Sequence, residues 1–243
     1  MIKRIGAIFS LGLLTLGAMV GIQSCDDKIE LSNFVVNVRF APNGETFTTG
    51  ETYMINGTAV EFNVLRFYMS GIGLQNSAGQ NVLTTSYVLA NPGQTRYEIG
   101  QVISQEYTGV TFNVGIDSFI NHLDPSQYVS QSVLSPQFPS VHWGWDPGYI
   151  FIRIDAMYDS DGDDVPDTGM EVHFGTDQFL RNIVIPGNID ATDKEEVEVS
   201  IDFDPIKLFT SVDFPTVNTT HVGDDIDFAN AVADNVESAF SIN

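Results

Sequence analysis

The sequence predicts an all-β protein, an antiparallel β-sandwich with a short C-terminal helix. Several segments alternate apolar and polar residues with a period of two, which places one face of each strand on a core. Turn-forming residues separate these segments at short intervals, as they do in β-sandwiches. Helical periodicity occurs clearly only near the end of the chain.

Two segments alternate most regularly. Phe34, Val36, Val38 and Phe40 fall on one face of the first. The second covers residues 196–203 and has apolar residues at every other position. Further strands are expected at residues 60–74, 107–115, 150–155, 170–175 and 179–185.

Turns and one helix complete the expected elements. Pro42-Asn43-Gly44, Asn91-Pro92-Gly93 and Pro186-Gly187-Asn188 read as turns between strands. Asp224 could cap the final helix, because a side-chain oxygen before the first turn accepts its free N–H groups. The apolar stripe expected on that helix contains Ile226, Ala229, Ala233, Val236 and Phe240.

Residues 1–24 have the three parts of a secretory signal peptide. Lys3 and Arg4 form the positive start, an apolar stretch follows from Ile5 to about Val20, and small or neutral residues precede Cys25. Cys25 is the only cysteine, and residues 22–25 resemble a bacterial lipobox. We therefore expect a lipoprotein anchored to a membrane of the bacterial cell envelope, in the periplasm or at the outer-membrane surface. The alternative is a buried cysteine after a conventional cleavage site.

The mature chain would be one strongly acidic domain. Loss of residues 1–24 leaves eight Lys and Arg residues against 32 Asp and Glu residues. This charge argues against nucleic acid as a partner and fits cations or basic proteins. Residues 25–32 read as an acidic tether and residues 33–243 as a single β domain. No cysteine remains for a disulfide, so a hydrophobic core must stabilise the fold.

The segment from Asp159 to Asp167 has the composition of a calcium loop. Calcium takes six to eight oxygen ligands, and carboxylates at alternate positions around a glycine turn can converge on it. The pattern resembles thrombospondin type 3 repeats and, more loosely, an EF-hand, although the EF-hand's closing position holds Met170. The alternative is a solvated acidic hairpin loop. The expected oxygen donors are Asp159, Asp161, Asp163, the Val165 carbonyl and Asp167.

Aromatic and histidine residues supply a second group of candidates. Trp143 and Trp145 would face the same way in an extended strand, and on their own read as core aromatics. Histidine is a common ligand of copper and zinc. No two histidines have a local metal-motif spacing, so a shared site would have to be assembled by the fold. The four histidines are His122, His142, His173 and His221.

Several of these segments together resemble the MbnP-like family of extracytoplasmic proteins. The most specific is Trp-x-Trp-x-x-Gly-Tyr at residues 143–149. Residues 112–118, Asn121-His122 and residues 172–175 also match, as do residues 65–70 and 233–235. The similarity runs in order through nearly all of the mature chain.

The resemblance implies a β-rich protein that binds copper after a tryptophan is oxidised to kynurenine. A partner di-haem enzyme of the MauG and cytochrome c peroxidase type would perform the oxidation. Carried onto this sequence, Trp143 or Trp145 would be modified. His122 and His173 would be the first candidates as ligands, with His142 and His221 after them.

Two hypotheses follow. The leading one is a non-enzymatic copper-binding lipoprotein that is the substrate of a di-haem partner. The alternative is a calcium-stabilised surface protein for adhesion or protein contact, in which the two tryptophans belong to the core. The sequence contains no Gly-x-Ser-x-Gly motif, phosphate-binding loop or zincin helix, so we do not expect an enzyme.

Overall fold

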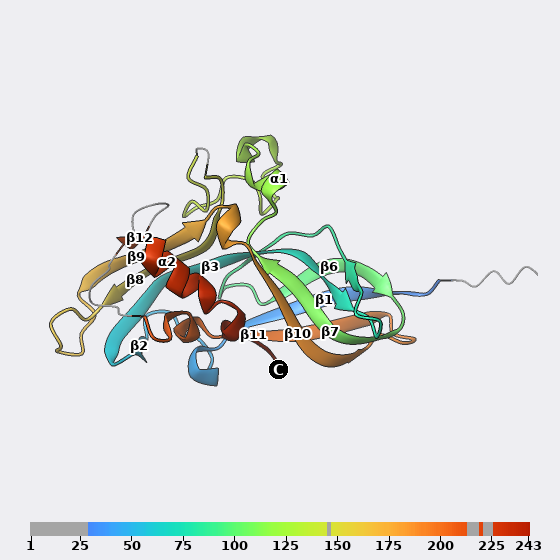
Figure 1. Ribbon diagram of the computed structural model, residues 1–243, viewed down its shortest axis with the longest axis horizontal. Helices are drawn as coiled ribbons and strands as arrows, with labels where there is room; N and C mark the ends of the chain where they lie inside the picture. Colours follow the sequence, from blue (N-terminus) through green and yellow to red (C-terminus); the bar gives the residue numbers. More distant parts are fainter. Residues whose placement is uncertain (1–28, 145–146, 213–218, 221–225) are drawn as a thin grey trace, which may run out of the picture.

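The computed structural model describes residues 29–144, 147–212, 219–220 and 226–243 (Figure 1). In this part of the chain the strands form two sheets, and the predicted β-sandwich is confirmed. No helix among these residues is long and apolar enough to cross a membrane. Cys25 and the signal segment lie outside the described residues.

The strands and helices follow one another along the chain mostly with short connections, and the longest connection runs from α1 to β8. Their bounds are β1 Leu31–Phe40, β2 Thr52–Ile55, β3 Thr58–Gln75, β4 Asn81–Leu83, β5 Val88–Ala90, β6 Arg96–Ile103, β7 Glu106–Val114, α1 Ser118–Asn121, β8 Ile150–Tyr158, β9 Thr168–Gly175, β10 Arg181–Asp190, β11 Glu196–Phe203, β12 Thr219–Thr220, α2 Ile226–Asp234 and β13 Phe240–Ile242.

The smaller sheet has the order β13-β11-β1-β6 among the described residues. Within it, β1 runs parallel to β11 and antiparallel to β6. The larger sheet has the order β10-β7-β3-β8-β9-β12, and β2, β4 and β5 also pair with the long strand β3. The pairs along β3 are antiparallel, whereas β12 runs parallel to β9.

The core lies between the two sheets, where the alternating residues of β1 and β11 point inward. Phe34, Val36, Val38 and Phe40 are all buried, as the alternation predicts. The apolar positions of β11 are buried too. An aromatic cluster joins the sheets: Phe203 lies 4.6 Å from Phe67 and 5.0 Å from Phe240 between ring centroids.

Two local predictions are wrong. Pro186-Gly187-Asn188 is not a turn between strands but an irregularity inside β10, where the pairing with β7 shifts between Pro186 and Ile189. The final helix ends at Asp234, because a 3₁₀ turn and β13 follow, and Phe240 belongs to that strand. Ile226 is exposed, and the buried face of α2 is Phe228, Ala229, Val232 and Ala233.

Candidate metal centre

A group of loops between β7 and β8 holds two of the four predicted copper ligands, His122 and His142. These loops and α1, residues 117–144 and 147–149, lie above the larger sheet in Figure 1, and we call them the site lobe. Two buried tyrosines attach the lobe to the sheet. The Tyr68 hydroxyl donates to the Val133 carbonyl at 2.8 Å, and the Tyr149 hydroxyl donates to the Leu134 carbonyl at 2.6 Å.

Asn121 joins three parts of the site lobe and its surroundings. Its side chain is fully buried; Oδ1 accepts the Tyr149 N–H at 2.9 Å, and Nδ2 donates to Asp177 Oδ1 at 3.1 Å. Gly148 has φ +79°, and a Cβ there would lie 2.2 Å from the Asn121 carbonyl oxygen. Only glycine therefore allows this close approach of the two loops.

His122 is positioned by the end of helix α1. Asp117 caps the helix by accepting the Ile120 N–H at 3.2 Å, and the helix ends at Asn121, so His122 is the next residue. The half-exposed His122 ring has Nε2 3.4 Å from Asp177 Oδ2. This distance permits charge attraction when the imidazole is protonated.

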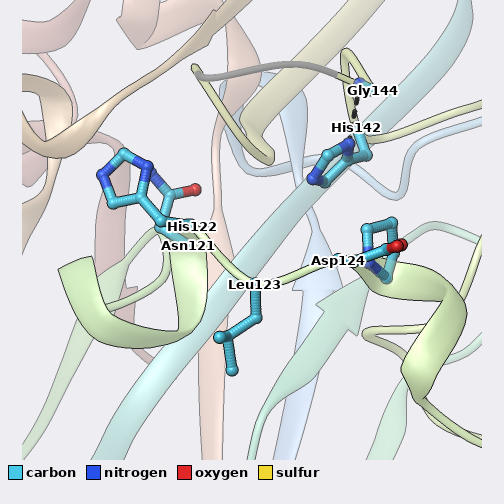
Figure 2. A pocket seen from close by; sticks show the side chains of 7 residues that line it. Asn121, His122, Leu123, Asp124, His142 and Gly144 are labelled. Carbon is cyan, nitrogen blue, oxygen red and sulfur yellow. Dashed lines mark hydrogen bonds between the residues drawn. The ribbon is translucent and has the colours of Figure 1, made fainter.

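A pocket of about 400 Å³ brings His122 and His142 to one surface depression. In Figure 2 the two rings lie on opposite sides of the pocket, with Asp124 on the side of His142. Asp124 accepts the Ser126 N–H at 2.8 Å, and this bond lowers the pKa of its carboxyl. The full lining is Asn121, His122, Leu123, Asp124, Pro125, His142 and Gly144.

His142 is held by one hydrogen bond and one ring contact. Its Nδ1 accepts the Gly144 N–H at 2.7 Å, and its ring meets Tyr149 edge-on at 4.6 Å. Burial lowers the pKa of the imidazole, against a smaller opposing effect of the Asp124 charge. Because Nδ1 accepts a hydrogen bond, the proton of the neutral ring is on Nε2. If Nδ1 bound a metal ion, it would lose its hydrogen bond from the Gly144 N–H. If Nε2 bound the ion, the proton on Nε2 would first have to be removed.

Trp143 packs on the larger sheet immediately beside the pocket. Its backbone N–H donates to the Gly148 carbonyl at 3.0 Å. Its ring covers Gly175, where a Cβ would lie 2.8 Å from ring atom Cζ3. The indole Nε1 is buried and has no hydrogen-bond partner among the described residues. Gly144 has φ +75°, so residues 143–145 do not form the expected extended segment. Trp145 and His221 lie outside the described residues.

His173 lies on β9, away from the pocket lining. It is buried, and its Nε2 lies 2.5 Å from Asp155 Oδ1. Arg153 Nη2 donates to the other oxygen of Asp155 at 2.6 Å. Burial favours the neutral carboxyl, but the hydrogen bonds from His173 and Arg153 outweigh it and lower the pKa of Asp155. The structure thus brings together His122 and His142 and places His173 in a separate ion-paired cluster.

The β8–β9 loop contains the predicted calcium donors. Among the described residues, Asp159, Asp161 and Asp163 are the group whose ligand atoms all lie within 4.8 Å of one another. Asp159 accepts the Gly162 N–H at 2.7 Å and the Asp164 N–H at 2.9 Å, and these bonds lower the pKa of its carboxyl. The charge of Asp163 raises the pKa of Asp161.

The other two expected calcium donors have different surroundings. Val165 donates its N–H to Asp163 Oδ1 at 2.9 Å, which orients this part of the loop. Asp167 Oδ1 accepts from the Ser160 hydroxyl at 3.1 Å and from the Thr168 hydroxyl at 3.0 Å. Its carboxylate is therefore already bonded at the base of the loop.

Sequence reasoning missed three residues of the pocket region. Asp124 lines the pocket, Asp177 contacts His122 and Asn121, and Gly175 makes room for the Trp143 ring. The Asp-Pro-Ser order at residues 124–126 is typical of a capped turn and could have marked Asp124 as a fixed side chain. No local sequence pattern marks Asp177 as part of the site, because the residues that it contacts lie in the β7–β8 loops, more than 50 residues away.

The fold and the pocket define a β-sandwich protein with a histidine-lined site in loops at one end of a sheet. The chain matches the MbnP family over residues 30–224, and it belongs to that family. A similar solved structure is that of MbnP from Methylosinus trichosporium. The two are 16% identical with a TM-score of 0.58, and the match covers 84% of this chain and 88% of that one. No curated protein matches the sequence.

Proposed function

We propose that the chain is a non-enzymatic, extracytoplasmic copper-binding protein, lipid-anchored through Cys25. The pocket lined by His122, Asp124 and His142 is the observation that supports this function best. Imidazole nitrogen and carboxylate oxygen are ligands that suit copper. The donor chemistry therefore fits the metal that the family resemblance implies, with His122 and His142 as the residues that would hold it.

The position of Trp143 supports its oxidation as part of the same function. It lies between two pocket residues in the sequence, His142 and Gly144, and its buried indole N–H has no hydrogen-bond partner in the described part of the chain. A buried unsatisfied donor costs about 1–3 kcal/mol, and such groups often mark functional positions. Oxidative opening of the indole ring by a di-haem partner would provide an aromatic amine next to the imidazoles. Trp145 remains the second candidate for modification.

Co-expression tests this function directly. The lipidated chain is produced with and without a di-haem peroxidase-like enzyme, and peptides containing Trp143 and Trp145 are examined by mass spectrometry. We expect the mass of kynurenine at one of them only when the enzyme is present, with copper binding that appears in the same sample. Unmodified tryptophans and no copper binding in the co-expressed sample would contradict the proposal.

The Asp159–Asp163 group favours a second candidate function, a calcium-stabilised surface protein for adhesion or protein contact. Calcium would neutralise the repulsion that raises the pKa of Asp161. We expect calcium to raise the thermal midpoint of the wild-type protein, and a chelator to reverse the increase.

The matched variants separate the metal from the fold. Asp161→Asn removes one negative charge of this group while keeping a side-chain oxygen, and should strongly reduce the calcium-dependent increase. Asp193→Asn removes a carboxylate charge from a different loop and should leave the increase unchanged. An equal calcium effect in wild type and Asp161→Asn would show that the ion binds elsewhere.

A further inference from the structure

Exposed aliphatic side chains gather where the domain begins. Leu31 of β1 and Ile103 of β6 are cross-strand partners and are 49% and 42% exposed. Ile29, two residues before Leu31, is 70% exposed. The Ser104 N–H donates to the Glu30 carbonyl at 2.8 Å, so the pairing continues toward Ile29. We call Ile29, Leu31 and Ile103 the aliphatic tip.

The outer face of the smaller sheet becomes more polar with distance from the tip. The next cross-strand pair is Asn33 and Gln101, whose side chains are hydrogen-bonded at 3.2 Å. Farther along, Arg96 forms an ion pair with Glu196 at 2.8 Å. Along β6 the outward side chains thus run from Ile103 through Gln101 to Glu98 and Arg96, from apolar through neutral polar to charged, in the order expected across the surface of a bilayer.

The length of the tether places the tip close to the proposed anchor. Ile29 follows Cys25 by four residues, and an extended chain spans at most about 3.6 Å per residue, or about 14 Å in all. An acylated Cys25 at the bilayer surface would therefore keep the tip within that distance. In Figure 1 β1 begins at the right-hand end of the molecule, and the β8–β9 loop lies at the opposite end.

The charges beside the tip decide between lipid surfaces. Glu30 lies between Ile29 and Leu31 of the tip. A turn that contains Asp193 and Glu195 is hydrogen-bonded beside it. The Asn33 N–H donates to the Glu195 carbonyl, and the Asp193 N–H donates to the Ser104 hydroxyl. Lys194 is the basic residue of this turn and contacts Asp190. Acidic side chains around the tip would be repelled by anionic lipid headgroups, so a zwitterionic surface suits the tip better.

We propose that the aliphatic tip inserts into the interface of a zwitterionic phospholipid bilayer and fixes the orientation of the domain on it. The inference rests on the lipid anchor at Cys25 that forms part of the proposed function. A flexible tether alone would let the domain tumble, whereas the tip provides a second contact next to the first. The β8–β9 loop then points away from the membrane.

Site-directed nitroxide labelling tests the proposal on the full lipidated protein. Cys25 is the only cysteine and its thiol is consumed by the anchor, so Ile103→Cys offers a single labelling position. Met54→Cys on β2 is the matched control, because Met54 is an exposed aliphatic residue at the other end of the molecule. In phosphatidylcholine vesicles we expect the label at 103 to be severalfold less accessible to a water-soluble nickel reagent than the label at 54.

The tip itself is tested by adding Ile29→Ser and Leu31→Ser to the Ile103→Cys protein, which should abolish the shielding. Equal accessibility at positions 103 and 54 in a protein with acylated Cys25 would overturn the inference and leave the anchor intact. Shielding that rises with protein density at constant lipid would identify a second copy as the occupant and also overturn it. An intact mass without acyl chains would overturn the anchor and the inference together.

Discussion

Replacing His142 with alanine is expected to lower the copper affinity of the modified protein by more than about 100-fold. Loss of an outer-shell partner typically costs about 10–100-fold in metal affinity, and a direct ligand should cost more. His122→Ala should have a similar effect, because the two rings line the same pocket. Competition titration with a copper chelator of known affinity measures both values.

Two controls distinguish loss of a ligand from loss of structure. Leu123→Ala changes a partly buried pocket residue whose side chain has no metal-ligand atom, and should leave the copper affinity unchanged. His173→Gln disrupts the buried contact with Asp155 and should lower thermal stability more than copper affinity. A large loss of affinity in His173→Gln, with none in His142→Ala, would assign the copper to the β9 cluster.

The second large effect concerns the core. Phe203→Ala should lower the free energy of unfolding by about 3–5 kcal/mol, the usual cost of emptying a buried phenylalanine position. The Phe203 ring is fully buried and contacts Phe40, Phe67 and Phe240, which belong to both sheets. For a domain of this size the thermal midpoint should fall by roughly 6–20 °C.

Phe138→Ala is the matched control for this substitution. Phe138 has the same side chain but is 94% exposed, so its loss should change stability by no more than about 0.5 kcal/mol. Denaturant unfolding of the two variants gives both values. Comparable losses would mean that the aromatic cluster between the sheets does not dominate the core.

The strands were the most predictable part of the fold. In β1 and β11 one face is buried and most of the other is exposed or partly exposed, so apolar residues recur with a period of two. β6 escaped prediction because Gly100 interrupts its alternation where its pairing with β1 shifts. Pro186 reads as a turn residue, but it lies at a β-bulge, where a missing N–H is tolerated.

The pocket was much less predictable than the sheets. His122 and His142 are 20 residues apart in loops, and no periodicity links them. Their common location depends on Asn121, which bonds Tyr149 and Asp177 at once. Such contacts depend on the three-dimensional path of the loops and leave no pattern in the sequence. The calcium candidates, by contrast, are local, and Asp159, Asp161 and Asp163 lie together as their spacing predicts.

The parallel pairing of β1 with β11 has a consequence for how the chain matures. Phe34 pairs with Val197, so the first strand meets this neighbour only when most of the chain is present. Contacts between residues so distant in sequence slow folding, because the intervening loop must first be closed. A chain that reaches its compartment N-terminus first would therefore keep β1 without this neighbour until the last quarter arrives. In such a chain the sandwich would close only when transport is nearly complete.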